Sequence, residues 1–208
     1  MTKNISIIDY DIGNILSVKR SVEILGFKTL VTNEKDRILN SDKIILPGVG
    51  AFKNGMNLLK KHNLIEILKE AAERKKSILG ICLGMQLFFD ESFEFGHTEG
   101  LGLIKGKVEK IIIDDNDESL KIPSIGWNEL IVKKKDKILS SIKNKNSTYF
   151  VHSYMASPED KSVITSVYKF GNKEIVASVN LENIYGCQFH PEKSGKIGLE
   201  ILNNFILS

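Results

Sequence analysis

The sequence contains little cysteine and little arginine: two cysteines and three arginines among 208 residues. Two cysteines allow at most one internal disulfide, which excludes a small disulfide-stapled fold. Arginine is the usual residue for reading bases and clamping phosphates, so its scarcity argues against a nucleic-acid-binding protein. The excess of basic over acidic side chains is only 29 − 26 = +3, which argues the same way.

Long apolar runs are also absent. No uncharged stretch reaches the ~20 residues that cross a bilayer. The N-terminus carries no apolar core followed by a small-residue cleavage site. We therefore expect no membrane partner, no signal peptide, a cytoplasmic location and reduced thiols. The hydrophobic share of 42% and charged share of 26% are typical of a folded domain, and we expect residues 1–208 to form a single domain.

The first half of the chain alternates strand-like and helix-like patterns. Short apolar runs predict buried strands, and apolar residues at helical spacing predict the helices between them. Strands are expected at 5–9, 27–32, 43–46 and 77–81, and helices at 14–25, 52–75 and 83–90. This alternation predicts an α/β fold with a doubly wound, mostly parallel central sheet and helices on both faces.

The second half predicts antiparallel strands that extend or flank this sheet, because short strand-like runs are joined by turns rich in Asn, Asp, Gly and Lys. A helix is expected at 198–207. The acidic stretch 114–119 predicts a solvated turn, since it lacks the glycine and distal glutamate of a calcium loop. The expected strands are 108–113, 129–132, 148–151, 163–168, 175–179 and 184–189.

The strongest chemical signal is the segment GICLG at 80–84. It follows a predicted strand and opens a predicted helix, like a nucleophile elbow with Cys82 in place of serine. The sharp turn leaves no room for side chains at Gly80 and Gly84, and a helix N-terminus favours the thiolate form. The pattern indicates a nucleophilic Cys82. A buried structural cysteine between incidental glycines is the alternative.

A base and its orienting group are candidates in the segment QFHPE at 188–192. Histidine can take up a proton at neutral pH and return it, and a carboxylate can fix its tautomer. His190 and Glu192 are two residues apart at a strand end, so both side chains can point the same way. A surface pair without function is the alternative. Cys187 lies on the opposite strand face, which predicts a core residue.

A glycine-rich turn follows the predicted strand at 43–46. Its backbone N–H groups at Gly48, Val49 and Gly50 could face a developing oxyanion. The loop lacks the Lys-Ser/Thr ending of a phosphate-binding P-loop. A plain turn between a strand and a helix is the alternative.

Taken together, these motifs resemble a known family. GICLGMQLFF around Cys82, LPGVGAF at 46–52 and YGCQFHPEKSG at 185–195 are similar to the triad-type (class I) glutamine amidotransferases. Four further segments resemble the glutaminase subunits of imidazole glycerol phosphate synthase, so the resemblance covers nearly the whole chain in order. They are IDYDIGNILSV near the N-terminus, GLGLIKGKV at 100–108, KIPSIGWNEL at 121–130 and YFVHSYMA at 149–156.

The resemblance implies a role for each candidate. Cys82 would be the nucleophile, His190 the base and acid, and Glu192 the orienter of His190, with backbone around Val49 and Gly50 as the oxyanion hole. Other residues would bind glutamine or face a synthase subunit. The glutamine-binding residues would be Gln86, His152, Ser153 and Tyr154, and the partner-facing residues Ser124, Trp127, Asn128 and Lys193.

The resemblance also implies the reaction and the partner. L-Glutamine would be hydrolysed to glutamate and ammonia through a γ-glutamyl thioester on Cys82, with no metal or organic cofactor. The ammonia would pass through a protected channel to a (β/α)8 cyclase subunit, which makes imidazole glycerol phosphate and AICAR (an aminoimidazole carboxamide ribotide) in histidine biosynthesis. The length accommodates a glutaminase domain and nothing else, so we expect a heterodimer with a separate synthase chain.

One departure keeps other functions open. The family pattern Pro-His-x-Gly-Trp-Asn has Ser124 in place of its histidine. A paralogous glutaminase that supplies ammonia for sugar amidation in surface-glycan biosynthesis is therefore one alternative. A catalytically idle docking or regulatory subunit is a second, and a cysteine-elbow hydrolase or chaperone of another family is a third.

Overall fold

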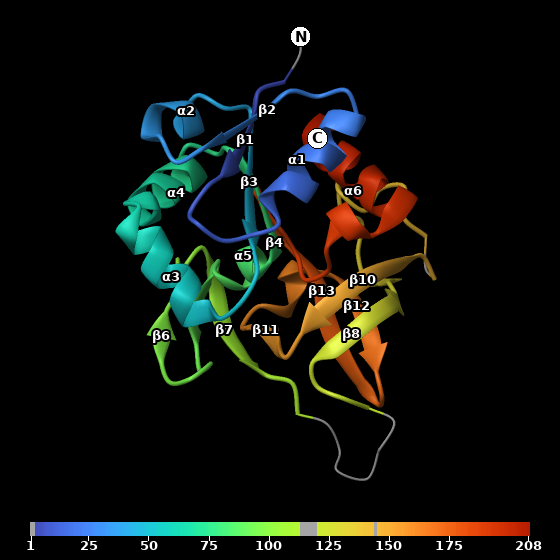
Figure 1. The fold of residues 1–208 in the computed structure, drawn as a ribbon. Coiled ribbons are helices and arrows are strands. Elements are labelled where there is room, and N and C mark those ends of the chain that lie inside the picture. The colour runs from blue at the N-terminus through green and yellow to red at the C-terminus, as the bar shows by residue number, and fades with distance from the viewer. Residues whose placement is uncertain (1–2, 113–119, 144) are drawn as a thin grey trace.

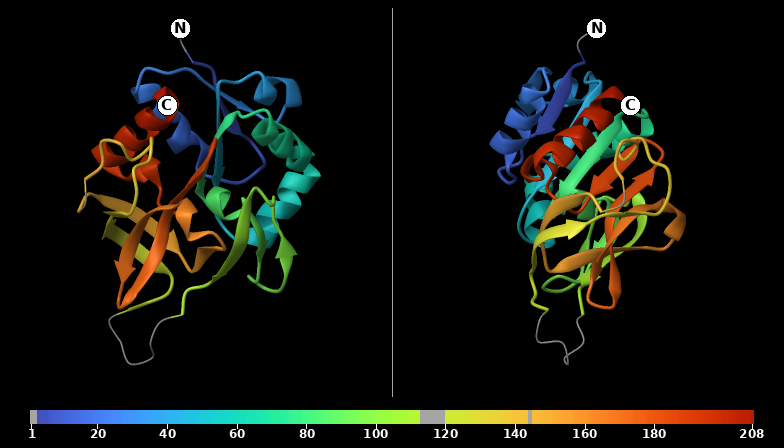
Figure 2. Two further views of the ribbon diagram at one scale, coloured as in Figure 1. Left: turned by 180° about the vertical axis from the view of Figure 1, so that it is seen from behind. Right: turned by 90° about the vertical axis from the view of Figure 1, so that its right-hand side faces the viewer.

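The computed structural model describes residues 3–112, 120–143 and 145–208. The turn expected at 114–119 lies outside these residues, as does position 113. The chain folds around one large sheet with helices on either side, and two smaller sheets lie beside it (Figures 1 and 2).

The large sheet confirms the predicted topology. Five strands pair in parallel in its first part, and the last three pair antiparallel. The antiparallel strands come from the second half of the chain, as the turn-rich pattern predicted. The order across the sheet is β2 (Thr29–Thr32), β1 (Ile5–Ile8), β3 (Lys43–Gly48), β4 (Ser77–Cys82), β14 (Ile184–Cys187), β13 (Lys173–Leu181), β12 (Ile164–Phe170) and β9 (Ile131–Val132).

Helices cover both faces of the parallel part, as Figure 1 shows. Side chains alternate along each strand. On β3, Ile45 belongs to one buried cluster, while Ile44 and Leu46 belong to the other. The Ile45 cluster includes residues of α1 (Ile15–Ile24) and α6 (Gly195–Leu207). The opposite cluster includes residues of α2 (Lys35–Leu39), α3 (Phe52–Lys61) and α4 (Leu64–Glu73). Burial on both faces explains why these strands read as continuous apolar runs.

The two smaller sheets come from the middle of the chain. One pairs β8 (Ser124–Glu129) with β10 (Ser147–His152) antiparallel. The other has four strands, in the order β11 (Tyr154–Pro158), β7 (Ile104–Lys110), β5 (Phe89–Ser92) and β6 (Thr98–Glu99). Only Ser153 separates β10 from β11 along the chain, so this residue connects both small sheets.

Several predicted boundaries are wrong. The helix expected at 83–90 is the single turn α5 (Leu83–Gln86), and β5 follows it. Residues 83–89 are all buried, so no amphipathic pattern could separate helix from strand. The single strand expected at 129–132 is divided between the end of β8 and the short strand β9, which belong to different sheets. The strand expected at 108–113 begins at Ile104. On β8 the apolar Ile125 and Trp127 face outward while Ser124 is buried, the reverse of the usual pattern.

Candidate active site

Cys82 ends β4 in a strained turn. Its φ of 54° and ψ of −110° are values that residues with a side chain rarely adopt. The glycines on either side are required by contact. A Cβ on Gly80 would lie 2.5 Å from Cε2 of Phe88, and one on Gly84 would lie 1.9 Å from the carbonyl oxygen of Leu46. The sequence prediction of a tight elbow is therefore confirmed, although α5 is too short to supply the expected dipole of a full helix.

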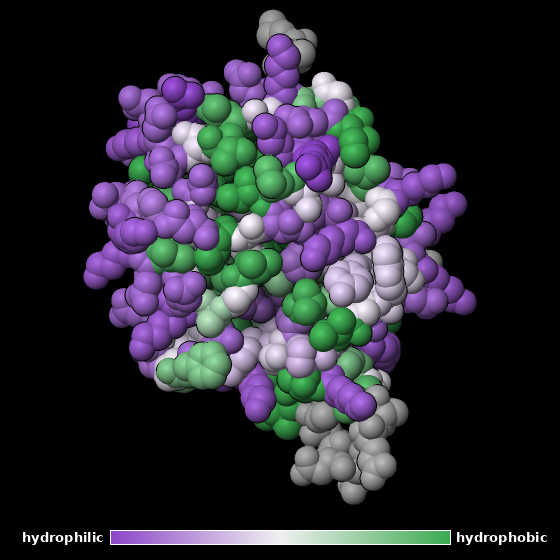
Figure 3. All heavy atoms as spheres, viewed as in Figure 1, coloured by the Kyte–Doolittle hydropathy of each residue, from purple (hydrophilic) through white to green (hydrophobic). Residues whose placement is uncertain are grey.

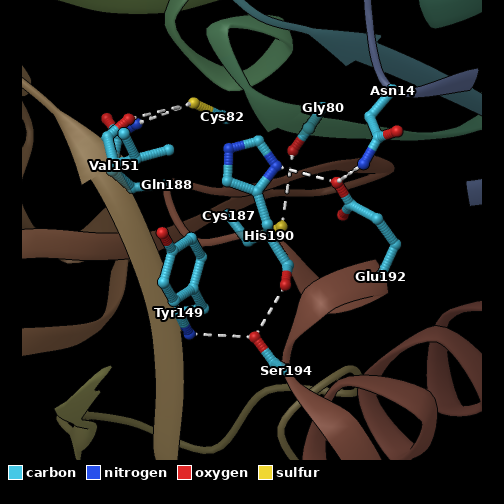
Figure 4. A network of polar contacts seen from close by, with 10 residues as sticks. All are labelled: Asn14, Gly80, Cys82, Tyr149, Val151, Cys187, Gln188, His190, Glu192 and Ser194. Carbon is cyan, nitrogen blue, oxygen red and sulfur yellow. Dashed lines mark hydrogen bonds and ion pairs between the residues drawn. The ribbon is translucent and has the colours of Figure 1, made fainter. Parts of the chain in front are cut away.

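His190 follows β14 and faces Glu192. Its Nδ1 lies 2.8 Å from Oε1 of Glu192, and both side chains are 1% exposed. Asn14 donates to the same oxygen at 3.3 Å. A carboxylate on Nδ1 requires the proton there, which fixes the imidazole orientation. Within the described residues, the buried Nε2 has no hydrogen-bond partner. It lies on the side of the ring nearer Cys82 and Gln188 (Figure 4).

The charge state of His190 follows from these neighbours. Burial alone would lower its pKa, but the Cys82 sulfur and the Glu192 carboxylate together outweigh burial and raise the pKa to about 10. His190 is therefore protonated at neutral pH and can donate a proton. The ion pair adds stability that is complete below the ordinary value of 6.5 and is lost as the pH rises through about 10.

The backbone of His190 is tied to β10. Its N–H donates to the carbonyl of Tyr149 at 2.9 Å. The Ser194 hydroxyl donates to the His190 carbonyl at 2.6 Å and accepts from the N–H of Tyr149 at 3.0 Å. Figure 4 shows the two hydrogen bonds of the Ser194 hydroxyl below the imidazole. Three hydrogen bonds thus fix the base relative to the strand that forms the next wall of the site.

A cavity of about 280 Å³ opens beside Cys82. This is near the lower end of the roughly 300–1,000 Å³ range of ligand pockets, which suits a small molecule. Gly48 does not line this cavity but pairs with Cys82 in the ladder of β3 and β4. Glu192 lies behind His190. The remaining predicted catalytic and glutamine-binding residues line the cavity together: Val49, Gly50, Cys82, Gln86, His152, Ser153, Tyr154 and His190.

The glycine-rich loop is held by Tyr10, which the sequence analysis did not single out. The Tyr10 hydroxyl is fully buried and donates to the carbonyl of Pro47 at 2.6 Å. Burial raises the pKa of Tyr10, so the hydroxyl keeps its proton. Gly50 has a φ of 95°, which favours glycine. Tyr10 therefore fixes the start of the loop whose end borders the cavity.

His152 belongs to a buried chain of hydrogen bonds. Its Nδ1 donates to the carbonyl of Tyr154 at 2.8 Å, so Nε2 accepts from the Tyr168 hydroxyl at 2.9 Å. The Tyr168 hydroxyl also contacts the Ser124 hydroxyl, with 3.1 Å between the two oxygens. Burial lowers the pKa of His152 to about 4, so it is neutral. The chain explains how a serine is accommodated at position 124.

This burial corrects one prediction. Ser124 was expected on a partner-facing surface, but it is 2% exposed and its hydroxyl is used inside the protein. Trp127 is 58% exposed, Lys193 is exposed and Asn128 is half-buried. None of these three lines the cavity. Their placement outside the pocket leaves a surface role open to them.

Glu94 and Gln188 are further polar residues that the sequence analysis left without a role. Glu94 lines the cavity, and its carboxylate accepts from the N–H of Phe52 at 2.7 Å. No local pattern marks Glu94, which lies between two short strands. Gln188 belongs to the quoted segment QFHPE, and the structure shows that it is completely buried. In the part of the chain that is described, no three His, Cys, Asp or Glu side chains are grouped to hold a metal ion.

The two cysteines have different surroundings. Cys187 is completely buried, and its thiol donates to the carbonyl of Gly80 at 3.7 Å. Burial raises the pKa of the Cys187 thiol well above its ordinary value. Both cysteines are free. The core position predicted for Cys187 is confirmed.

The chain is similar in sequence to proteins of one known family. Residues 6–208 match the sequence model of the family "Glutamine amidotransferase class-I". The imidazole glycerol phosphate synthase subunit HisH of Pelagibacter ubique is 47% identical over 208 residues, which cover 98% of this chain and 99% of that protein. The subunit of the same name from Aquifex aeolicus is 43% identical over 200 residues, with 96% and 94% covered.

Solved structures show the same fold. PurLQS from Thermotoga maritima superposes with a TM-score of 0.74 at 22% identity, covering 100% of this chain and 99% of that chain. The glutaminase domain of Trypanosoma brucei CTPS, with bound acivicin, gives a TM-score of 0.68 at 18% identity, covering 98% and 94%. At these identities the likeness concerns the fold alone.

Proposed function

This chain belongs to the class-I glutamine amidotransferase family, and from that premise we propose that it is the glutaminase subunit of an imidazole glycerol phosphate synthase in histidine biosynthesis. The observation that carries the proposal is the arrangement of Cys82 and His190 at the cavity, with Glu192 hydrogen-bonded to Nδ1 of His190. The full-length relatives named HisH support the pathway over a role in surface-glycan synthesis. The complete triad argues against an idle docking subunit.

The first half of the proposed reaction is acyl transfer to sulfur. The Cys82 thiolate attacks the side-chain amide carbon of glutamine, and the amide oxygen becomes an oxyanion. Backbone N–H groups of the loop 48–50 stabilise that charge. The His190 imidazolium, with its pKa raised to about 10, protonates the leaving ammonia. The product is a γ-glutamyl thioester on Cys82, and His190 is then neutral.

The second half is hydrolysis. Neutral His190 takes a proton from water, whose oxygen attacks the thioester carbon. The thioester bond breaks, glutamate leaves, and Cys82 returns as a thiolate beside an imidazolium. Glu192 keeps the ring oriented through both halves, because its hydrogen bond fixes Nδ1 as the protonated nitrogen. We assign no metal or organic cofactor to any step.

We propose that the cavity recognises the ammonium group of the substrate through hydrogen-bond acceptors. Both amide hydrogens of Gln86 are already used, by the carbonyl of Tyr154 at 3.0 Å and by Oε1 of Gln188 at 2.9 Å. Oε1 of Gln86 is then the atom left for a ligand, and it accepts hydrogen bonds. Glu94 adds negative charge on the same cavity. Two acceptors suit the ammonium group of an amino acid.

The partner is proposed to be a cyclase subunit with a (β/α)8 barrel, which would receive ammonia in a heterodimer. Relatives named as subunits support a partner chain. On the face drawn in Figure 3, apolar side chains reach the surface between polar flanks. Our candidates for the contact are the exposed Ile125 and Trp127 of β8, the half-buried Asn128 and the exposed Lys193.

A cytoplasmic location belongs to the same proposal, and two free thiols support a reducing compartment. Within the described ranges, no helix is long and apolar enough to cross a membrane.

The test is glutamate release with and without the candidate cyclase. Cys82→Ala and His190→Ala are expected to reduce turnover at least about a thousandfold, since members of a nucleophile–base unit act together. Serine replacement of Cys187 is the matched control and is expected to leave turnover nearly unchanged. Glutamate release by Cys82→Ala at the wild-type rate would refute the proposed function.

A further inference from the structure

Gln188 contacts the sulfur of Cys82. Its Nε2 lies 3.6 Å from Sγ, and the whole residue is buried. On another side, Sγ lies 4.0 Å from the carbonyl oxygen of Val151. A carbonyl can receive a thiol proton, but it repels a thiolate. The amide N–H of Gln188 is the group that favours the charged sulfur.

The orientation of the Gln188 amide is determined by its neighbours. The carbonyl of Tyr154 can only accept, so Gln86 must present its nitrogen there. The second hydrogen on that nitrogen then faces Gln188 at 2.9 Å, which requires an oxygen from Gln188. The Gln188 nitrogen is left on the side of the sulfur. A flipped Gln188 would place two donors against each other at Gln86 and an oxygen against Cys82.

The carbonyl of Tyr154, from which this chain of hydrogen bonds starts, is itself held in place. Tyr154 accepts a second hydrogen bond, from Nδ1 of His152 at 2.8 Å. His152 is neutral and 7% exposed, and its other nitrogen is occupied by Tyr168. Every link from His152 to Cys82 is therefore directional, with donors and acceptors assigned.

We propose that Gln188 is a catalytic residue that donates an N–H to the attacking sulfur of Cys82, and that Gln86 is a positioning residue that keeps the Gln188 amide in this orientation. The inference rests on the proposed function, because it concerns the same nucleophile. It gives Gln86 a second task besides the substrate contact. When the thiolate becomes a thioester, the sulfur loses its charge and the hydrogen bond weakens, so the interaction favours the state that attacks.

The experiment measures the rate at which iodoacetamide alkylates Cys82 at neutral pH, with Cys82→Ala as background. Iodoacetamide does not use the glutamine contacts of Gln86, so the rate reports the sulfur alone. Gln188→Met keeps the size and removes the donor, and we expect about tenfold slower alkylation, the value of one charge-assisted hydrogen bond. Gln188→Glu can still accept from Gln86 but turns an oxygen toward the sulfur, and we expect a larger loss than in Gln188→Met.

Two further variants separate positioning from packing. Gln86→Met is expected to slow alkylation severalfold in the wild-type background and to change nothing in Gln188→Met, because Gln86 acts through Gln188. Ultraviolet thiolate absorbance at neutral pH should fall in parallel. Unaltered alkylation in Gln188→Met, or equal losses in Gln188→Met and Gln188→Glu, would overturn the inference. If wild-type Cys82 instead reacts no faster than an ordinary exposed thiol, the proposed function fails as well.

Discussion

Replacing His152 by asparagine is expected to remove a pH-dependent part of the stability. Asparagine can still donate to the carbonyl of Tyr154, but it does not titrate. In the folded protein burial lowers the pKa of His152 to about 4, from an ordinary value of 6.5. The unfolded chain therefore binds more protons between these two values. The stability that neutral His152 contributes is complete above 6.5 and is lost as the pH falls through about 4.

The size follows from the two pKa values. At 1.36 kcal/mol for each pKa unit, a difference of about 2.5 units has a limiting value of about 3 kcal/mol. At about pH 5 only part of that limit is reached, and linkage gives a loss of about 2 kcal/mol relative to neutral pH. Other groups also titrate in this range, including the half-buried Asp136, whose pKa burial raises. They are present in both proteins and cancel in the comparison.

The assay is urea unfolding of wild type and His152→Asn at neutral pH and at about pH 5. The wild-type free energy of unfolding should fall by about 2 kcal/mol more than that of the variant between the two pH values. The variant is expected to be less stable at neutral pH, because Tyr168 loses its acceptor. Equal pH-dependent losses in the two proteins would refute the reasoning, since His152 would then titrate alike in the folded and unfolded chains.

Three further substitutions test other parts of the site. Gly84→Ala forces a Cβ to within 1.9 Å of the Leu46 carbonyl oxygen, and calorimetry should show destabilisation of about 3 kcal/mol or more. Tyr10→Phe leaves the buried Pro47 carbonyl without its 2.6 Å donor; we expect a loss of about 1–3 kcal/mol in urea unfolding together with a lower kcat. Trp127→Ala is expected to change stability by less than about 0.5 kcal/mol and to weaken cyclase binding about tenfold or more in titration calorimetry.

A specific result would contradict each of these three predictions. A Gly84→Ala protein of wild-type stability would mean that the elbow can relax. A Tyr10→Phe enzyme with full kcat would mean that the loop keeps its position without the hydroxyl. Ile24 is 72% exposed on α1 and serves as the control for Trp127; equal effects of the two alanine variants on cyclase binding would show that the Trp127 surface is not the contact.

The parallel half of the fold was predictable because its signals are local. Strands buried on both faces appear as short apolar runs, and the amphipathic helices between them have the spacing of a helix. The middle of the chain was not predictable in the same way. Residues 83–89 are all buried, so the spacing of apolar residues does not distinguish a helix from a strand there. On β8, the apolar Trp127 is exposed and the polar Ser124 is buried, which reverses the expected pattern.

The part of the site that could be predicted consists of residues that lie within distinctive sequence motifs. Cys82, His190 and Glu192 lie in segments whose glycines and order are distinctive. Tyr10 and Gln188 could not be assigned a role from sequence, because their tasks depend on partners far along the chain: Pro47 for the first and Gln86 with Cys82 for the second. Ser124 was misjudged because its motif suggested a surface, whereas the fold turns its side chain toward Tyr168.

The central claim is that Cys82 is the residue acylated by glutamine. The most direct measurement is peptide mapping by mass spectrometry after treatment with diazo-oxo-norleucine, a glutamine-like electrophile that remains on the nucleophile. The account predicts one adduct per chain, on the peptide that contains Cys82, blocked by excess glutamine and missing in Cys82→Ala. An adduct on Cys187, or a wild-type protein that stays unlabelled while it hydrolyses glutamine, would contradict it.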